Sequence, residues 1–218
     1  MVLNKINLEI KKGEFLVIFG PNGAGKTTLI KIMSTLLSPN SGSVVIDGFD
    51  IKENPIEIRK RIGVISHETY LYPDLTATEN LKFFGKMYNL PNLDRKIKEV
   101  LKQVGLQHRA KSLVRTFSRG MKQRLSVARA IIHDPPILFL DEPFTGLDQY
   151  ASTTFEKIFS TIGDKTTIMV SHNLERGLKM CSRAIILNKG QIVYSANKDD
   201  ISLEEFKNIY EHYVSEVG

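Results

Sequence analysis

One eight-residue segment, Gly20-Pro21-Asn22-Gly23-Ala24-Gly25-Lys26-Thr27, constrains the fold of this chain more than any other. It fits the pattern G-x-x-x-x-G-K-[ST] and follows an apolar run, Phe15–Phe19, that is typical of a strand buried on both faces. A helix is predicted after it, from about Lys26 to Leu37. Glycines let the backbone wrap around a phosphate without Cβ clashes, and the loop amides and the helix N-terminus then supply positive charge. The segment therefore predicts a phosphate-binding loop between a strand and a helix.

Two side chains of this loop carry the predicted chemistry. Lys26 can reach the β- and γ-phosphates of a nucleotide, and the Thr27 hydroxyl can ligate Mg²⁺. The predicted nucleotide contacts comprise all eight residues of the loop and the next residue, Thr28.

A second apolar strand, Ile137–Leu140, ends on two carboxylates, Asp141 and Glu142. Ligands of open α/β sheets bind at the carboxyl ends of the strands. We predict that Asp141 belongs to the Mg²⁺ shell through water, because Mg²⁺ keeps several of its waters. Glu142 has no evident structural reason to lie beside a triphosphate, and it suits the polarisation of an attacking water.

The order of elements predicts an α/β fold with a mostly parallel sheet, helices on its faces and β-hairpin elements. Further strands are expected at 2–10, 44–46, 61–66, 167–170, 184–187 and 192–193. Strand signals vanish between about 69 and 134, where helices are predicted, one of them starting at a capping box of Thr76 and Glu79. We expect one domain over residues 1–218, with a core at about 1–68 and 135–218 and an inserted helical lobe at about 69–134.

Composition narrows the class of protein. Apolar residues make up 42% of the chain and charged residues 25%, which is typical of globular proteins. The apolar runs are far shorter than the roughly 20 residues that span a bilayer, and no apolar signal core is found near the start. The single cysteine, Cys181, excludes an intrachain disulfide and fits a cytoplasmic location. The net charge of +6 favours either anionic partners or simply a solvated surface.

Three further segments resemble those of ATP-binding-cassette (ABC) proteins. Phe117–Arg124 resembles the signature segment of that family, Thr145–Asp148 its D-loop, and Val170–His172 its switch-histidine segment. With the phosphate loop and the Asp-Glu strand they form five motifs in the family's order, and the resemblance covers essentially the whole chain. It implies a P-loop NTPase core with an inserted helical lobe, ATP and Mg²⁺ as ligands, and ATP hydrolysis.

The resemblance also assigns roles to residues. It implies that Ser118 and Gly120 face the γ-phosphate of an ATP held by a partner subunit, so that two chains enclose two ATP molecules head-to-tail. Asp148 is placed among the nucleotide contacts. His172 is expected to contact the γ-phosphate and to help orient the water or Glu142. Lys26, Glu142 and His172 are thus the predicted catalytic residues.

Four positions depart from the family pattern. The aromatic residue that usually stacks on adenine is not found upstream of Leu3, so either the start is shortened or this contact is missing. His67 stands where the family has a glutamine. It could accept a hydrogen bond from a metal-bound water, or it could be an ordinary loop histidine. Arg119 and Met121 replace a glycine and a glutamine of the signature, and Arg119 could add charge near the γ-phosphate or point to solvent.

The layout resembles the motor subunit of a transporter. The short span between the phosphate loop and the signature has no sustained heptads, which excludes the chromosome-maintenance members of the family. The expected partners are separate transmembrane subunits, at the cytoplasmic face of the membrane, and a second ATP-binding subunit in a homodimer or heterodimer. Residues 66–81 and Phe117–Met121 resemble the haem exporters of cytochrome c maturation, and drug and lipid exporters share much of this pattern.

The alternative is a soluble, non-transport ABC ATPase with a regulatory or nucleic-acid-associated role. Only the net charge of +6 supports it. No nucleic acid is expected as a partner, because the sequence lacks an aromatic and basic stacking pattern.

Overall fold

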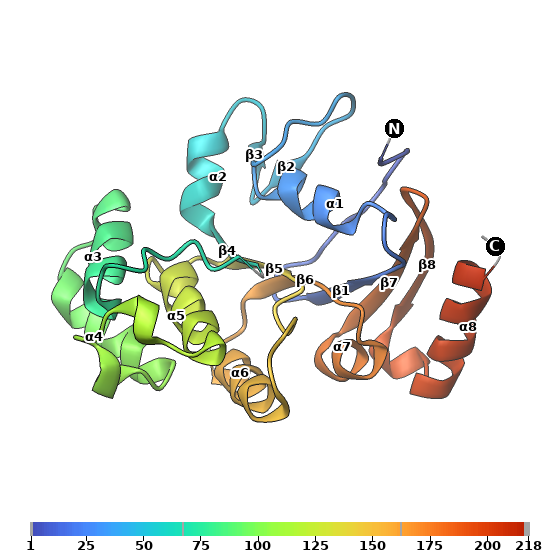
Figure 1. Cartoon of the computed structure of the whole chain (residues 1–218). Coiled ribbons are helices and arrows are strands. Elements are labelled where there is room, and N and C mark those ends of the chain that lie inside the picture. The colour runs from blue at the N-terminus through green and yellow to red at the C-terminus, as the bar shows by residue number, and fades with distance from the viewer. Residues whose placement is uncertain (1, 67, 162, 216–218) are drawn as a thin grey trace. The chain divides into compact units, whose positions relative to one another are not determined.

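The computed structural model describes residues 2–66, 68–161 and 163–215 (Figure 1). The chain divides into two compact units. The first contains Met1–Ile62, Ile137–Glu142 and Lys165–Gly218, and the second contains Gly63–Pro136 and Pro143–Asp164. The boundaries of the expected core and lobe stay a prediction.

The first unit is built on a mixed, mostly parallel sheet. Within this unit the strands follow the order β5-β6-β1-β7-β8. They are β5 (Ile137–Asp141), β6 (Thr166–Val170), β1 (Phe15–Phe19), β7 (Arg183–Asn188) and β8 (Gln191–Asn197). All neighbours pair in parallel except β7 and β8, which form the predicted antiparallel hairpin. A smaller antiparallel pair joins β2 (Val45–Ile46) to β3 (Phe49–Asp50), and β4 (Ile62–Ser66) begins at the last residue of the first segment.

Helices cover both faces of this sheet, as its apolar strands require. Residues 16–19 of β1 and 168–170 of β6 are at most 2% exposed, which confirms that these strands are buried on both sides. The helices of this unit are α1 (Lys26–Met33), α2 (Pro55–Arg61), α7 (Leu174–Met180) and α8 (Leu203–Ser215), with a 3₁₀ turn η3 (Lys198–Asp200). Helix α1 lies on one side of the sheet and α7 on the other (Figure 1).

The strand expected over residues 2–10 is wrong, because these residues form no strand in the structure. Lys5 has a φ of 52°, which breaks the extended backbone. The segment is held by single hydrogen bonds instead: Asn4 N donates to Gly190 O at 2.8 Å, and Arg183 Nη2 donates to Glu9 O at 2.6 Å. The alternating apolar residues therefore half-bury their side chains without joining a ladder.

Helix α1 ends at Met33 and not near Leu37, because Thr35 turns to a φ of 63°. Leu36 N and Leu37 N then donate to Lys31 O and close the helix end. Helices α2 and α7 were not expected from the sequence. Each has only seven residues, which is too short for a clear helical period.

The second unit is mostly helical. Its helices are α3 (Ala77–Met87), α4 (Leu93–Gln103), α5 (Arg119–Ile131) and α6 (Gln149–Thr161), with 3₁₀ turns η1 (Gln107–Arg109) and η2 (Val114–Thr116). Helices α3, α4 and α5 pack on one another. Leu81 of α3, Leu125 and Val127 of α5, and Leu106, which lies just after α4, are fully buried. The period-3.6 apolar pattern of these segments thus forms a core of its own.

The predicted capping box at the start of α3 is confirmed. Glu79 N donates to Thr76 Oγ1 at 3.1 Å, and Thr76 N donates to Glu79 Oε2 at 2.7 Å. We expect Thr76→Ala to lower the unfolding free energy by about 1 kcal/mol, because an N-cap side chain satisfies a helix N–H that would otherwise lack a partner. Urea unfolding followed by circular dichroism measures this change. Lys98→Ala, an exposed change on α4, is the control, and an equal midpoint for both variants would contradict the prediction.

Candidate functional site

The loop from Gly20 to Thr27 joins β1 to α1, as the sequence predicts. Its backbone needs glycine at two positions for reasons of space. A Cβ at Gly20 would lie 2.1 Å from the carbonyl oxygen of Leu187, and one at Gly25 would lie 2.7 Å from Leu3 Cδ2. Both glycines also have positive φ values, 153° and 104°. The loop can therefore adopt its path only because these residues carry no side chain.

The Lys26 side chain is only 8% exposed and folds back along the loop. Its Nζ donates to Gly20 O at 2.7 Å and to Pro21 O at 2.9 Å. Burial lowers the pKa of the Lys26 ammonium group, and the nearby carboxylates of Glu142 and Asp141 act in the opposite direction. The structure thus places a buried cation against the loop that was predicted to bind phosphate.

The two predicted metal ligands lie together. Thr27 Oγ1 donates to Asp141 Oδ1 at 3.1 Å, and Asp141, the last residue of β5, is 6% exposed. A hydroxyl and a carboxylate are the hard oxygen donors that Mg²⁺ prefers. Among the residues that the structure describes, no group of three or more His, Cys, Asp or Glu could hold a metal ion. The pair therefore fits an ion that takes its other ligands from phosphate and water.

Glu142 and His172 are joined directly. His172 Nδ1 lies 2.6 Å from Glu142 Oε2, and the histidine side chain is 67% exposed against 23% for the glutamate. An ionised carboxylate only accepts hydrogen bonds, so this contact requires the tautomer in which Nδ1 carries the proton. Glu142 has a φ of 50°, a left-handed conformation that is strained for a residue with a side chain. Such strain persists only where the surroundings impose it, and it is common at functional sites.

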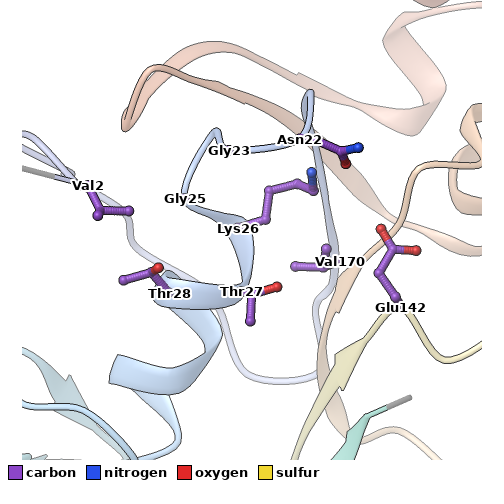
Figure 2. A pocket seen from close by; sticks show the side chains of 9 residues that line it. All are labelled: Val2, Asn22, Gly23, Gly25, Lys26, Thr27, Thr28, Glu142 and Val170. Atoms are coloured by element: carbon purple, nitrogen blue, oxygen red, sulfur yellow. The ribbon is translucent and has the colours of Figure 1, made fainter. Parts of the chain in front are cut away.

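Lys26, Thr27 and Glu142 of the first unit line one cavity of about 260 Å³ (Figure 2). Lys26 and Thr27 lie between Val2 and Thr28 on one side and Glu142 on the other (Figure 2). The wall is formed by Val2, Asn22, Gly23, Gly25, Lys26, Thr27, Thr28, Glu142 and Val170. The cavity thus brings the loop together with the carboxylate that comes directly after β5.

The remaining predicted contacts lie in the second unit, at the starts of α5 and α6. Ser118 caps α5, because Met121 N donates to Ser118 Oγ at 3.2 Å. Asp148 caps α6, because its Oδ1 accepts from Ala151 N at 2.7 Å. Gly120 is close to the same residue, since a Cβ there would lie 3.0 Å from Ala151 Cβ. The structure thus brings Ser118, Gly120 and Asp148 to neighbouring helix starts.

His67 and Arg119 are two of the positions at which the sequence departs from the family pattern, and the structure describes only Arg119. His67 lies outside the described residues, and its role at the metal-bound water stays a prediction. Arg119 makes a contact that neither of its two expected positions includes: its Nη2 donates to Thr145 O at 2.8 Å.

The sequence profile that is described as ABC transporter matches residues 3–145. The chain belongs to the ABC transporter family. It is an ATP-binding subunit of the ABC type and an ATP hydrolase, and its α/β fold is that of the ABC ATPase cassettes.

Three known proteins illustrate the relationship of this ABC ATPase. It is 39% identical over 194 residues to the ABC transporter ATP-binding protein NatA of Bacillus subtilis, covering 87% of this chain and 79% of the relative. It is 37% identical over 204 residues to the linearmycin resistance ATP-binding protein LnrL of the same species, covering 92% of this chain and 66% of the relative. Its structure matches the ATP-binding cassette MJ0796, a dimer in a post-hydrolysis state bound to ADP and Pi, with a TM-score of 0.81, 29% identity and 90% of each chain covered.

Two structural features of this ABC ATPase were not predicted from its sequence. The left-handed backbone of Glu142 has no signal in the residue types around it. Gln123, by contrast, is a polar residue on the buried face of α5 and is 5% exposed. An amide among apolar neighbours at helical spacing is a signal that could have identified it.

No helix in the described part of this ABC ATPase is both long and apolar enough to cross a membrane.

Proposed function

We propose that this ABC ATPase is the motor of a transporter whose membrane-spanning subunits are separate chains, and that it lies at the cytoplasmic face of the membrane. ATP-driven, head-to-tail dimerisation of two ATP-binding subunits moves the cargo, and the direction is export. The similarity to a linearmycin resistance protein supports export, because a cell can resist a compound by removing it.

One observation carries the proposal. In the first unit, the Thr27–Asp141 and Glu142–His172 contacts, at 3.1 and 2.6 Å, flank a buried lysine on a glycine-rich loop. This arrangement provides a cation, a pair of metal ligands and a candidate base, and Lys26, Thr27 and Glu142 line one cavity. Hydrolysis of a nucleoside triphosphate needs all three.

Each side chain of the site has its own role in ATP hydrolysis. The loop amides and Lys26 bind the phosphates, and Lys26 then donates to phosphate oxygens in place of the carbonyls of Gly20 and Pro21. Thr27 and Asp141 would hold Mg²⁺, which neutralises part of the phosphate charge when bound. Glu142 orients the attacking water and accepts its proton. His172 holds the Glu142 carboxylate in place through Nδ1, and its contact with the γ-phosphate is what the resemblance to the family implies.

The second unit supplies the contacts to a partner. We infer that Ser118 and Gly120, at the positive end of α5, meet the γ-phosphate of the ATP bound to the other subunit. Asp148 lies at the adjacent helix start and belongs to the same surface. A partner of either kind, a second copy or another ATP-binding subunit, fits this scheme. The dimeric state of the cassette MJ0796 supports it.

Gel filtration with nucleotide tests this function. Glu142→Gln, in which turnover should stop, is expected to elute as a dimer with ATP and as a monomer with ADP, because only ATP presents a γ-phosphate to both subunits. In the same background, Ser118→Asp should abolish the dimer, since it keeps a capping side chain but adds a negative charge facing the phosphate. Ser118→Asn, a neutral cap, is the matched control. A monomer with ATP and with ADP, at nucleotide concentrations far above the ATP dissociation constant, would contradict the proposal.

A further inference from the structure

Two side chains of α5 hold the loop that comes after Glu142. We call residues 143–148 the post-Glu142 loop. Gln123 Nε2 donates to Pro143 O at 3.1 Å, and Arg119 Nη2 donates to Thr145 O at 2.8 Å. Positions four apart lie on the same face of a helix, one turn above the other. Helix α5 thus contacts two carbonyls of this loop from one face, and all of these residues belong to the second unit.

The Gln123 contact is buried. Gln123 is 5% exposed, and its amide nitrogen also donates to Ser66 O at 3.3 Å. The side-chain amide group has two N–H donors, so both go to backbone carbonyls. Buried carbonyls need such partners, since an unpaired one retains the cost of leaving water. Gln123 therefore joins the last residue of β4 to the first residue of the post-Glu142 loop.

The Arg119 guanidinium group packs against the glycine of this loop. A Cβ at Gly146 would lie 2.3 Å from Arg119 Cζ and 2.5 Å from both of its terminal nitrogens. The guanidinium group thus fills the space that a side chain at position 146 would need. Gly146 also has a φ of 71°, which disfavours other residues for a second reason. Within the described residues Arg119 has no ion pair, so its placement rests on the hydrogen bond to Thr145 O and on packing against Gly146.

We propose that Arg119 and Gln123 are positioning residues for ATP hydrolysis. Glu142 is joined to Pro143 by a peptide bond, so the post-Glu142 loop constrains its strained backbone from one side and β5 constrains it from the other. Asp148 ends the same loop. By holding the carbonyls at 143 and 145, the two side chains keep Glu142 and Asp148 in the conformations that catalysis uses. This inference rests on the proposed role of Glu142 as base.

Arg119 gives the cleaner test, because it is exposed and its removal leaves the core intact. We expect Arg119→Ala to lower kcat by about tenfold, because misplacing a reacting group by about 1 Å can cost as much as a hundredfold. The dissociation constant for ATP, measured by calorimetry, should stay within about twofold, since the loop that binds the phosphates belongs to the first unit. Lys111→Ala, which removes an exposed cation from the same unit, should keep the parent kcat. Gln123→Met, which has similar length and no donor, should lower kcat as Arg119→Ala does.

A double-mutant cycle separates this role from a general structural one. Gly146→Ala should displace the guanidinium group and so lose the Arg119 contact as well. The double variant Arg119→Ala with Gly146→Ala should then be about as active as Gly146→Ala alone, because the contact that Arg119→Ala removes is already lost in Gly146→Ala. If the two losses simply multiply, or if Arg119→Ala has the parent kcat, the inference is overturned.

Glu142→Gln keeps the two proposals distinguishable. Turnover above about a tenth of the parent rate in that variant would refute the role of Glu142 itself. An inactive Glu142→Gln beside a fully active Arg119→Ala would overturn only the positioning role.

Discussion

Glu142→Gln is expected to lower kcat for ATP hydrolysis by at least about a hundredfold, because general-base catalysis contributes roughly 10²- to 10⁴-fold. The amide has the shape of the carboxylate but cannot take a proton from water. ATP affinity should stay within about threefold, since the loop and Lys26 hold the phosphates. Phosphate release measures kcat, and calorimetry with ATP and Mg²⁺ measures affinity.

The matched control is Glu175→Gln, the same chemical change at an exposed position near the start of α7. It should leave both quantities unchanged, although it alters net charge by the same amount. Residual turnover above about a tenth of the parent rate in Glu142→Gln would show that another group activates the water. His172 would then be the first candidate, because it lies 2.6 Å from the same carboxylate.

Lys26→Ala is expected to weaken ATP binding by about 10- to 100-fold, because a hydrogen bond to a charged group is worth about 1.5–3 kcal/mol. The buried ammonium group is the cation that the loop offers to the β- and γ-phosphates in this proposal. Its removal also leaves the carbonyls of Gly20 and Pro21 without that donor, at 2.7 and 2.9 Å in the parent. Calorimetric titration with ATP and Mg²⁺ measures the effect.

Lys31→Ala is the control for this variant, because Lys31 is an exposed lysine on the same helix. If Lys26→Ala acted only by lowering the net positive charge of the protein, Lys31→Ala would weaken ATP binding by the same amount. Equal affinity of Lys26→Ala and the parent would refute the phosphate-loop assignment.

Neighbouring residues in the sequence were sufficient to predict the phosphate-binding loop and several local turns of this protein. The G-x-x-x-x-G-K-[ST] pattern after an apolar strand predicts the loop, because the steric needs of a backbone around a phosphate are met by glycine at those positions. The capping box of Thr76 and Glu79 and the hairpin of β7 and β8 depend on neighbouring residues, and both are confirmed. Alternating apolar residues at 2–10 misled the prediction, because a strand also needs a partner to complete its ladder.

The sheet decided which residues meet around the phosphate-binding loop. Asp141 and Val170 are paired in the parallel register of β5 and β6. This pairing brings Glu142, the residue after Asp141, and His172, two residues after Val170, to one edge of the sheet. The register between two strands depends on how both faces of the sheet pack, so it cannot be predicted from the sequence of one strand. Arg119 also depends on tertiary contacts: its residue type predicts a charge near phosphate or in solvent, whereas in the structure it packs against Gly146 and donates to Thr145 O. The sequence by itself determined which chemical groups are present and which local turns they form, whereas the tertiary structure decided which of them meet, because contacts between distant segments arise only when the whole core packs.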